Sequence, residues 1–162
     1  MKVTTKDLTI AGLLTALSVI IITFMPSLKV EPFSATLGAH TPIFIAMFLN
    51  PVSAILTVIG GTIAFYMKLG PIVALRAFSH IFFAMTGLYL CKKKWNLVWI
   101  CLITMIIHAL FETAIVYVAF FMGYGANNGI WLVTGVGTML HHTIDFIIAV
   151  LIFKTLKTAK VF

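Results

Sequence analysis

Long apolar runs dominate this chain and decide which folds are open to it. A helix needs roughly 20 residues to cross about 30 Å of hydrocarbon, and by that measure the chain holds six candidate membrane-spanning segments. They cover residues 8–25, 37–49, 51–68, 71–91, 96–122 and 130–153. Apolar residues make up 62% of the 162 residues and charged residues 9%, against about 45–50% and about 25% in soluble domains. A single core could not bury so much apolar surface, so we expect an integral membrane protein.

Proline and glycine mark the ends of the expected helices, because proline lacks an amide donor and glycine tolerates positive φ. The breaks fall at Pro26, Asn50-Pro51, Gly70-Pro71, the lysine run 92–94 and the segment 123–129. The second span is short, and Thr41-Pro42 could be an N-cap followed by proline at the first helical position. An alternative therefore stays open, in which the second and third spans form one kinked helix and the chain crosses five times.

Lysine placement favours six spans over five, because positive residues gather on the cytoplasmic side of membrane proteins. With six spans and both termini inside, the cytoplasmic lysines are Lys2, Lys6, Lys92, Lys93, Lys94, Lys154, Lys157 and Lys160, and the external ones are Lys29 and Lys68. That split is eight to two, against seven to three for five spans. We therefore expect an all-α six-transmembrane-helix bundle with both termini cytoplasmic. Residues 1–162 would form one transmembrane domain in the plasma membrane, and we expect no nucleic-acid partner.

Three consecutive expected helices carry ionisable residues four positions apart, and such residues share one face of a helix. The pairs are Arg76 with His80, His108 with Glu112, and His141 with Asp145. A charge in the bilayer core is costly, roughly 2.5–3.5 kcal/mol for Arg or Asp on insertion scales. We therefore expect these faces to point at one another or at a water-filled cavity.

Depth along the helices groups some of these residues near the external surface. At a rise of 1.5 Å per residue, Arg76 lies roughly 8 Å and Glu112 roughly 15 Å below the external ends of their spans. The candidate substrate-binding residues are His40, Arg76, His80, Glu112, Asn127, Asn128 and Trp131. His141 and Asp145 lie deeper and fit a structural or coupling pair. Alternatives stay open: Arg76 and Glu112 as a purely structural ion pair, and Trp131 as an interfacial anchor.

Metal and catalytic motifs are not evident in the sequence. Five histidines and two buried carboxylates suit zinc or nickel chemically, but no HxH, HExxH or Cys-His spacing appears, so we expect no metal site. Cys91 and Cys101 lie at or inside apolar segments and are interpreted as free thiols. No GxSxG motif is present, and Asp145 is the only aspartate inside a span. A small intramembrane enzyme that uses Glu112 or Asp145 with the histidines remains the rival interpretation.

The first expected span carries a face of small residues, Ala11, Gly12, Thr15 and Ala16. Such a face lets another helix approach closely. It predicts either a docking surface for a partner subunit or close packing inside the same bundle.

Taken together, these residues resemble those of a known family, the substrate-binding S components of energy-coupling factor (ECF) vitamin transporters. The resemblance covers the whole chain as architecture, and the segments 38–51, 60–61, 69–71 and 76–80 are similar to the second-to-fourth-helix region of such proteins. It implies a substrate site near the external face, built from the first loop and helices four to six. It also implies that the small-residue face docks on a transmembrane coupling subunit. Two ATP-binding subunits would drive uptake, and this chain itself would hold no cofactor.

The substrate implied by the resemblance is a small vitamin, with the niacin-type S components as the leading analogue. Arg76 could pair bidentately with a carboxylate, with His40 or His80 nearby. A pyrimidine or pyridine vitamin without a carboxylate stays open, because Glu112 could neutralise Arg76 or bind a cationic ring nitrogen. The nickel and cobalt members resemble the chain less, since they begin with a Met-His metal-binding terminus and this chain begins Met1-Lys2.

Overall fold

The computed structural model of the chain describes residues 3–30, 33–124 and 129–160, and in these it is predominantly α-helical. The helices are α1 (Thr5–Phe24), α2 (Thr41–Leu49), α3 (Pro51–Leu69), α4 (Pro71–Phe78), α5 (His80–Lys92), α6 (Leu97–Ala119), the π-helical turn η1 (Phe120–Tyr124) and α7 (Ile130–Thr158). The strands are β1 (Ser27–Val30) and β2 (Phe33–Thr36).

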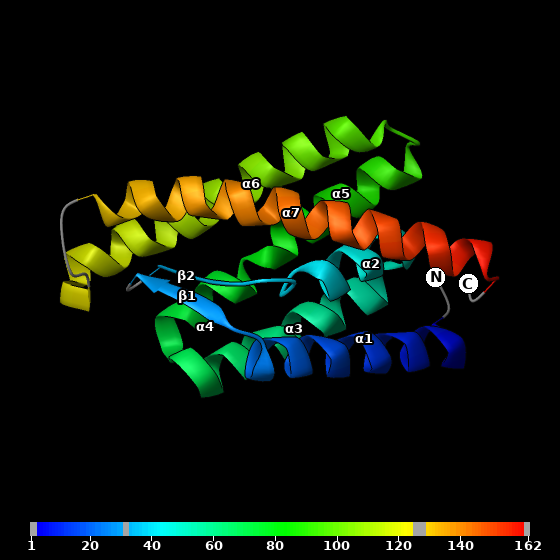
Figure 1. The fold of residues 1–162 in the computed structure, drawn as a ribbon, viewed down its shortest axis with the longest axis horizontal. Helices are drawn as coiled ribbons and strands as arrows, with labels where there is room; N and C mark the ends of the chain where they lie inside the picture. The colour runs from blue at the N-terminus through cyan, green and yellow to red at the C-terminus, as the bar shows by residue number, and fades with distance from the viewer. Residues whose placement is uncertain (1–2, 31–32, 125–128, 161–162) are drawn as a thin grey trace.

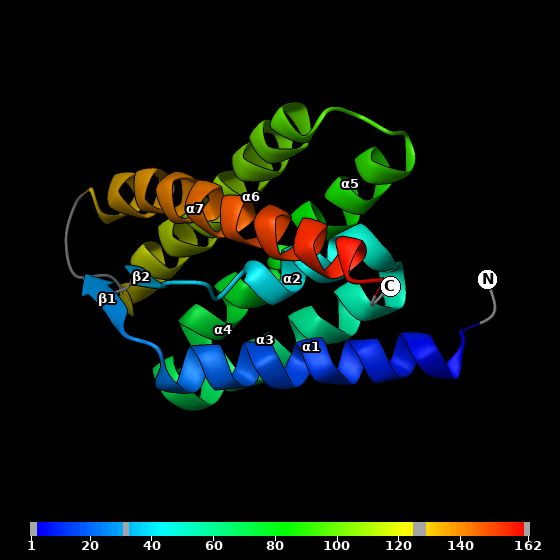
Figure 2. The same ribbon diagram turned by 45° about the vertical axis from the view of Figure 1, so that its right-hand side comes forward.

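The helices form one elongated bundle, and the described chain begins and ends at the same end of it (Figure 1). The view turned by 45° shows the start of α1 and the end of α7 on that side again, with the β1–β2 hairpin toward the opposite end (Figure 2). Five helical segments of the described chain are long and apolar enough to cross a membrane. These are Thr5–Phe24, Pro51–Leu69, Pro71–Lys92, Leu97–Tyr124 and Ile130–Thr158.

The second expected span is a short buried helix rather than a full-length one. Helix α2 has 9 residues, which at 1.5 Å per residue is about 14 Å of length. Its N-cap is His40 and not Thr41 as expected, so Thr41 is the first helical residue and Pro42 the second. Asn50 then adopts an extended conformation, φ −161° and ψ 161°, and its side chain caps α3 by accepting from the Ser53 N–H at 2.8 Å. Helices α2 and α3 are therefore two separate helices, not one kinked helix.

The fourth expected span is broken between α4 and α5, at Ser79. The Ser79 hydroxyl donates to the Arg76 carbonyl at 2.6 Å, a local bond of the kind that bends helices. Gly70 precedes α4 with φ 85°, a left-handed backbone conformation that favours glycine. The break lies between Arg76 and His80, so it changes how these two side chains face the interior.

Helices α1 and α3 pack closely because α3 presents glycines to α1. A Cβ built on Gly60 would lie 2.1 Å from Cγ2 of Thr15. The residues of the small-residue face of α1 differ in burial: Ala11 is buried, while Gly12 and Ala16 are exposed. No atom lies within 4 Å of a Cβ built on Gly12. Part of this face packs inside the bundle and part remains open.

A β-hairpin replaces the loop that the sequence suggests between the first two spans. Strands β1 and β2 pair antiparallel, from Ser27 opposite Thr36 to Val30 opposite Phe33. Strand β2 leads directly toward the turn before α2 and contacts α7. The hairpin therefore lies over the polar interior of the bundle.

Candidate functional site

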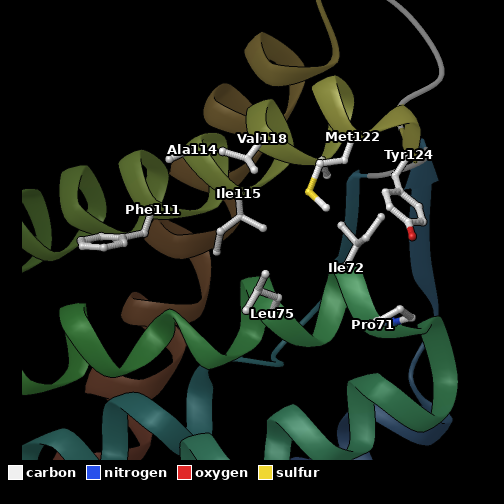
Figure 3. Close-up of a pocket in the computed structure, with 10 residues that line it drawn as sticks. Pro71, Ile72, Leu75, Phe111, Ala114, Ile115, Val118, Met122 and Tyr124 are labelled. Atoms are coloured by element: carbon white, nitrogen blue, oxygen red, sulfur yellow. The ribbon is translucent and has the colours of Figure 1, made fainter.

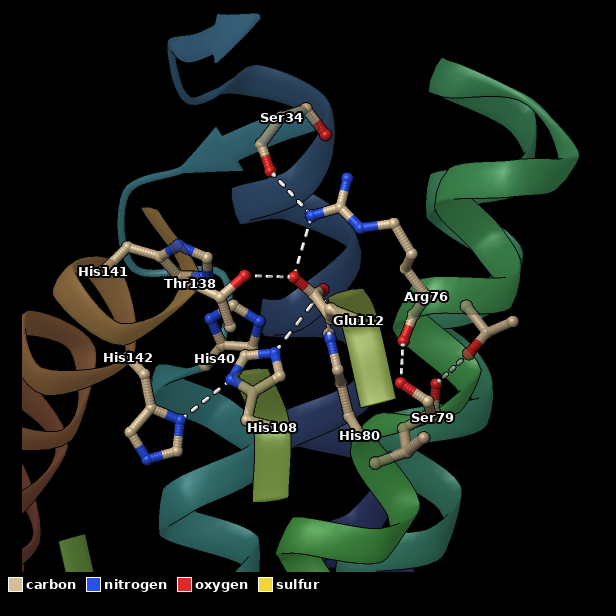
Figure 4. A network of polar contacts seen from close by, with 12 residues as sticks. Ser34, His40, Arg76, Ser79, His80, His108, Glu112, Thr138, His141 and His142 are labelled. Carbon is tan, nitrogen blue, oxygen red and sulfur yellow. Dashed lines mark hydrogen bonds and ion pairs between the residues drawn. The ribbon is translucent and has the colours of Figure 1, made fainter. Parts of the chain in front are cut away.

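All five histidines of the chain gather in one buried cluster around Glu112 (Figure 4). Asp145 is buried too and lies against His40. The members come from the turn before α2 and from α4, α5, α6 and α7. They are His40, Arg76, His80, His108, Glu112, Thr138, His141, His142 and Asp145, and each is at most 8% exposed. The expected convergence of the three ionisable faces is therefore present in the structure.

Glu112 on α6 is the centre of the cluster. Its Oε2 accepts hydrogen bonds from Arg76 Nη2 at 2.8 Å and from the Thr138 hydroxyl at 2.5 Å. Its Oε1 lies 3.2 Å from His80 Nε2 and 3.5 Å from His108 Nε2. Both members of the Arg76–Glu112 pair are buried, with side chains 2% and 4% exposed. Groups from four helices thus surround the Glu112 carboxylate. Arg76 also extends toward the hairpin, where its Nη2 lies 3.5 Å from the Ser34 carbonyl of β2.

Asp145 on α7 holds the turn that precedes α2. Its Oδ1 accepts from the Gly38 N–H at 2.8 Å, and its Oδ2 accepts from the His40 N–H at 3.0 Å. The same Oδ2 lies 3.0 Å from His40 Nδ1. His141 instead has its Nδ1 2.9 Å from the Gly137 carbonyl and stacks on the His40 ring at 4.7 Å. Asp145 therefore binds the backbone and a side chain of a turn that lies more than a hundred positions earlier in the sequence.

Two members of the cluster, His142 and Thr138, are absent from the set expected from the sequence. The two Nδ1 atoms of His142 and His108 lie 2.9 Å apart, and His142 Nε2 lies 3.1 Å from the Thr104 hydroxyl. A signal for them exists in α7, where buried polar residues recur at positions 134, 138, 142 and 145. That spacing of four, four and three follows one helix face.

A small cavity lies above Glu112, between the cluster and the hairpin. Its lining includes Ser34 and Thr36 of β2 together with Arg76, His80 and His141. The volume open to the centre of a water molecule is about 10 Å³, and one buried water needs about 10–15 Å³ by this measure. Polar and apolar residues both line the cavity, and its volume is too small for a ligand with a ring unless surrounding residues such as those of β2 move.

The remaining expected site residues do not join this cavity. Trp131 lies in the first turn of α7 and is 46% exposed. Asn127 and Asn128 lie outside the residues that the structure describes. The cysteines Cys91 and Cys101 are free thiols, as expected, and lie away from the cluster.

A second hollow, of about 420 Å³, lies between α4 and the end of α6 and is apolar (Figure 3). Ile72 and Leu75 of α4 face Ile115 and Met122 across the hollow. Among the described residues that line it, Tyr124 is the one with a polar side-chain group, its hydroxyl. It offers no charged group to a polar ligand. The cavity beside Arg76 and Glu112 is therefore the candidate ligand site.

One curated protein shows a relationship to the chain along nearly its whole length. The chain is 33% identical to the niacin transporter NiaX of Lactococcus lactis subsp. cremoris (strain MG1363), in an alignment that covers 98% of this chain and 78% of that protein. No family model matches the chain. No solved structure matches it either.

Proposed function

Because the chain belongs to the family of the niacin transporter NiaX, we propose that it captures niacin as the S component of an ECF-type importer. The relationship confirms the niacin-type resemblance drawn from the sequence. Together with the five helices that are long and apolar enough to span a membrane, it identifies the chain as a multi-pass transport protein of the cell membrane. The chain is related to a transporter and not to an enzyme, so the rival interpretation as an intramembrane enzyme has no support from its relative.

The proposed topology has six crossings with both termini in the cytoplasm. Five crossings are the long helices, and the sixth is the returning segment that β2 and α2 form together. Support comes from the shared end at which α1 begins and α7 ends (Figure 1), and from the lysine run that joins α5 to α6 at that same end. The positive-inside rule then assigns that end to the cytoplasm and the hairpin to the external side.

The proposed niacin site is the cavity beneath the hairpin, with Arg76 as the partner of the carboxylate. The observation that carries this assignment is a buried guanidinium at the edge of a polar cavity, in a chain related to a transporter of a small carboxylate. Arginine presents a planar fork that matches a carboxylate. Ser34 and Thr36 line the cavity and their hydroxyls are buried without a hydrogen bond among the described residues, so they are donors available to a ligand. The hairpin would have to shift for niacin to enter.

The proposed partners are a transmembrane coupling subunit and two ATP-binding subunits. The exposed part of the small-residue face, Gly12 and Ala16, supports a docking role because a close helix approach needs small side chains. In this proposal ATP is used by the partner subunits, and the chain itself carries no cofactor.

Niacin binding to the purified chain is the direct test. We expect niacin to bind in isothermal titration calorimetry and to be recovered by mass spectrometry after gentle purification, while nicotinamide, which lacks the carboxylate, binds at least tenfold more weakly. Equal affinity for both compounds would contradict the assignment of Arg76. Copurification with a coupling subunit and two ATPases tests the partners, and purification of an active transporter that contains this chain alone would exclude them.

A further inference from the structure

Three histidines of the cluster, His40, His80 and His108, offer nitrogen atoms that all lie within 4.8 Å of one another. They come from three parts of the fold, the turn before α2, α5 and α6, and all are buried. We propose that these histidines, with Glu112, form a binding site for one divalent transition metal ion of the zinc class. Three imidazole nitrogens and a carboxylate oxygen are ligands that suit Zn²⁺.

The position of Glu112 agrees with a tetrahedral site. Bond lengths of about 2.0–2.2 Å from Zn²⁺ to nitrogen or oxygen place neighbouring tetrahedral ligands about 3.3–3.5 Å apart. Glu112 Oε1 lies 3.2 Å from His80 Nε2 and 3.5 Å from His108 Nε2. Arg76 and Thr138 bind the other oxygen, Oε2, and so leave Oε1 directed at the two imidazoles. The nitrogens lie within 4.8 Å of one another, so no pair would need to close by more than about 1.5 Å to reach the tetrahedral spacing.

Outer partners orient two of the three imidazoles. Asp145 lies against His40 Nδ1 at 3.0 Å, and His142 lies against His108 Nδ1 at 2.9 Å. In metal sites the non-ligating nitrogen of a histidine is held in this way, usually by a carboxylate or a carbonyl. The arrangement leaves Nε2 of both histidines as the nitrogen available to an ion.

Hydrogen bonding and charge also favour the binding of a cation. His108 Nε2 is buried and makes no hydrogen bond to any residue that the structure describes, and a buried polar atom of this kind calls for an ion or water as its partner. With neutral histidines, the described cluster contains two carboxylates, Glu112 and Asp145, against one cation, Arg76. One bound cation would offset this excess of buried negative charge.

The ion would also bear on vitamin capture, and this part rests on the proposed function. Arg76 is already paired with Glu112 at 2.8 Å, so a vitamin carboxylate enters a cavity whose guanidinium is largely neutralised. An ion bound to Oε1 of Glu112 would add positive charge at the floor of that cavity. We therefore expect niacin to bind more tightly to the metal-loaded protein than to the metal-free protein.

Metal binding is measured first without vitamin, on the full chain purified in detergent with an affinity tag that contains no histidine. After treatment with EDTA, the protein is dialysed against Zn²⁺ and the bound metal is counted by mass spectrometry. We expect about one Zn²⁺ per chain, and Co²⁺ should give the visible absorption of a tetrahedral site. His80→Gln and His108→Gln should each weaken Zn²⁺ binding by at least tenfold. The matched control replaces both cysteines, Cys91→Ser with Cys101→Ser, and should keep the ion.

Each outcome decides one part of the inference. Absence of bound Zn²⁺ and of a Co²⁺ spectrum in the unchanged protein would overturn the site, even if a histidine variant failed to fold. Loss of Zn²⁺ in the cysteine control would overturn it too, since the thiols would then be the ligands. Niacin binding without any metal binding would refute the metal site and leave the proposed function standing. Metal binding with no niacin binding under any condition would refute the proposed function and leave the metal site standing. Equal niacin affinity with and without Zn²⁺ would refute the link between them.

Discussion

Replacement of Arg76 and Glu112, singly and together, separates a ligand site from a structural ion pair. The two side chains are nearly fully buried and 2.8 Å apart. Removal of one partner from such a pair leaves an uncompensated buried charge, which costs about 3–5 kcal/mol of stability. In Arg76→Ala, Glu112 still accepts from Thr138 and lies near His80, so we expect a loss at the lower end of this range. Glu112→Gln removes the negative charge beside the buried Arg76 guanidinium, and we expect the larger loss there.

The effect on niacin affinity follows from the hydrogen bonds that Arg76 would make to a carboxylate. Hydrogen bonds to charged groups contribute about 1.5–3 kcal/mol, which is roughly a 10- to 100-fold change in affinity. We expect Arg76→Ala to reach the upper end. Arg76→Lys should fall between Arg76→Ala and the parent, because lysine keeps the charge and loses the planar fork.

Two measurements on the same samples distinguish a ligand site from a structural ion pair. They are niacin affinity by calorimetry and thermal unfolding in detergent. If Arg76 binds the vitamin, the double variant Arg76→Ala with Glu112→Gln should recover much of the lost stability and still bind niacin poorly. A double variant that binds niacin as well as the parent does would show that Arg76 is not part of the site.

Four further predictions test the packing of the bundle, the docking face and the topology. Asp145→Asn should lower stability by about 1–3 kcal/mol, seen as a lower thermal unfolding temperature, because it weakens three contacts to the turn before α2; an unchanged unfolding temperature would contradict this role. Gly60→Ala should destabilise the solitary protein by pushing α1 from α3, whereas Gly12→Ala meets no atom within 4 Å and should not. Gly12→Leu should then reduce assembly with a coupling subunit while niacin binding survives, and the reverse result would argue against docking through this face. In a background without native cysteines, a cysteine at Gly123 should react with an impermeant thiol reagent from outside and one at Lys93 should not; opposite labelling would refute the proposed topology.

The sequence predicted the polar interior because the spacing of ionisable residues along each helix is a local property. His108 and Glu112, four residues apart, do contact one another, and the faces of α4, α5 and α6 meet as expected. The spacing of residues along one helix does not predict which other part of the chain packs against that face. Asp145 also binds His40, which lies 105 positions earlier, and the spacing on α7 does not reveal this contact.

Other features escaped prediction for reasons of the same kind. The break at Ser79 involves neither proline nor glycine; it accompanies a hydroxyl bond to the Arg76 carbonyl, which composition does not reveal. The β-hairpin is too short for its pairing to stand out from a loop in the sequence. Three histidines that approach one another from three separate parts of the chain leave no spacing motif, and for that reason the sequence alone predicted no metal site.

The contact between Asp145 and the turn before α2 sets an order of events during synthesis. Backbone N–H groups buried away from water must find a partner, because each unsatisfied group costs several kcal/mol in a lipid environment. The N–H groups of Gly38 and His40 find theirs on α7, 107 and 105 residues later. When α1 and α3 leave the ribosome, the segment between them has no acceptor for these donors. The turn before α2 can therefore form these two hydrogen bonds only after α7 has been synthesised.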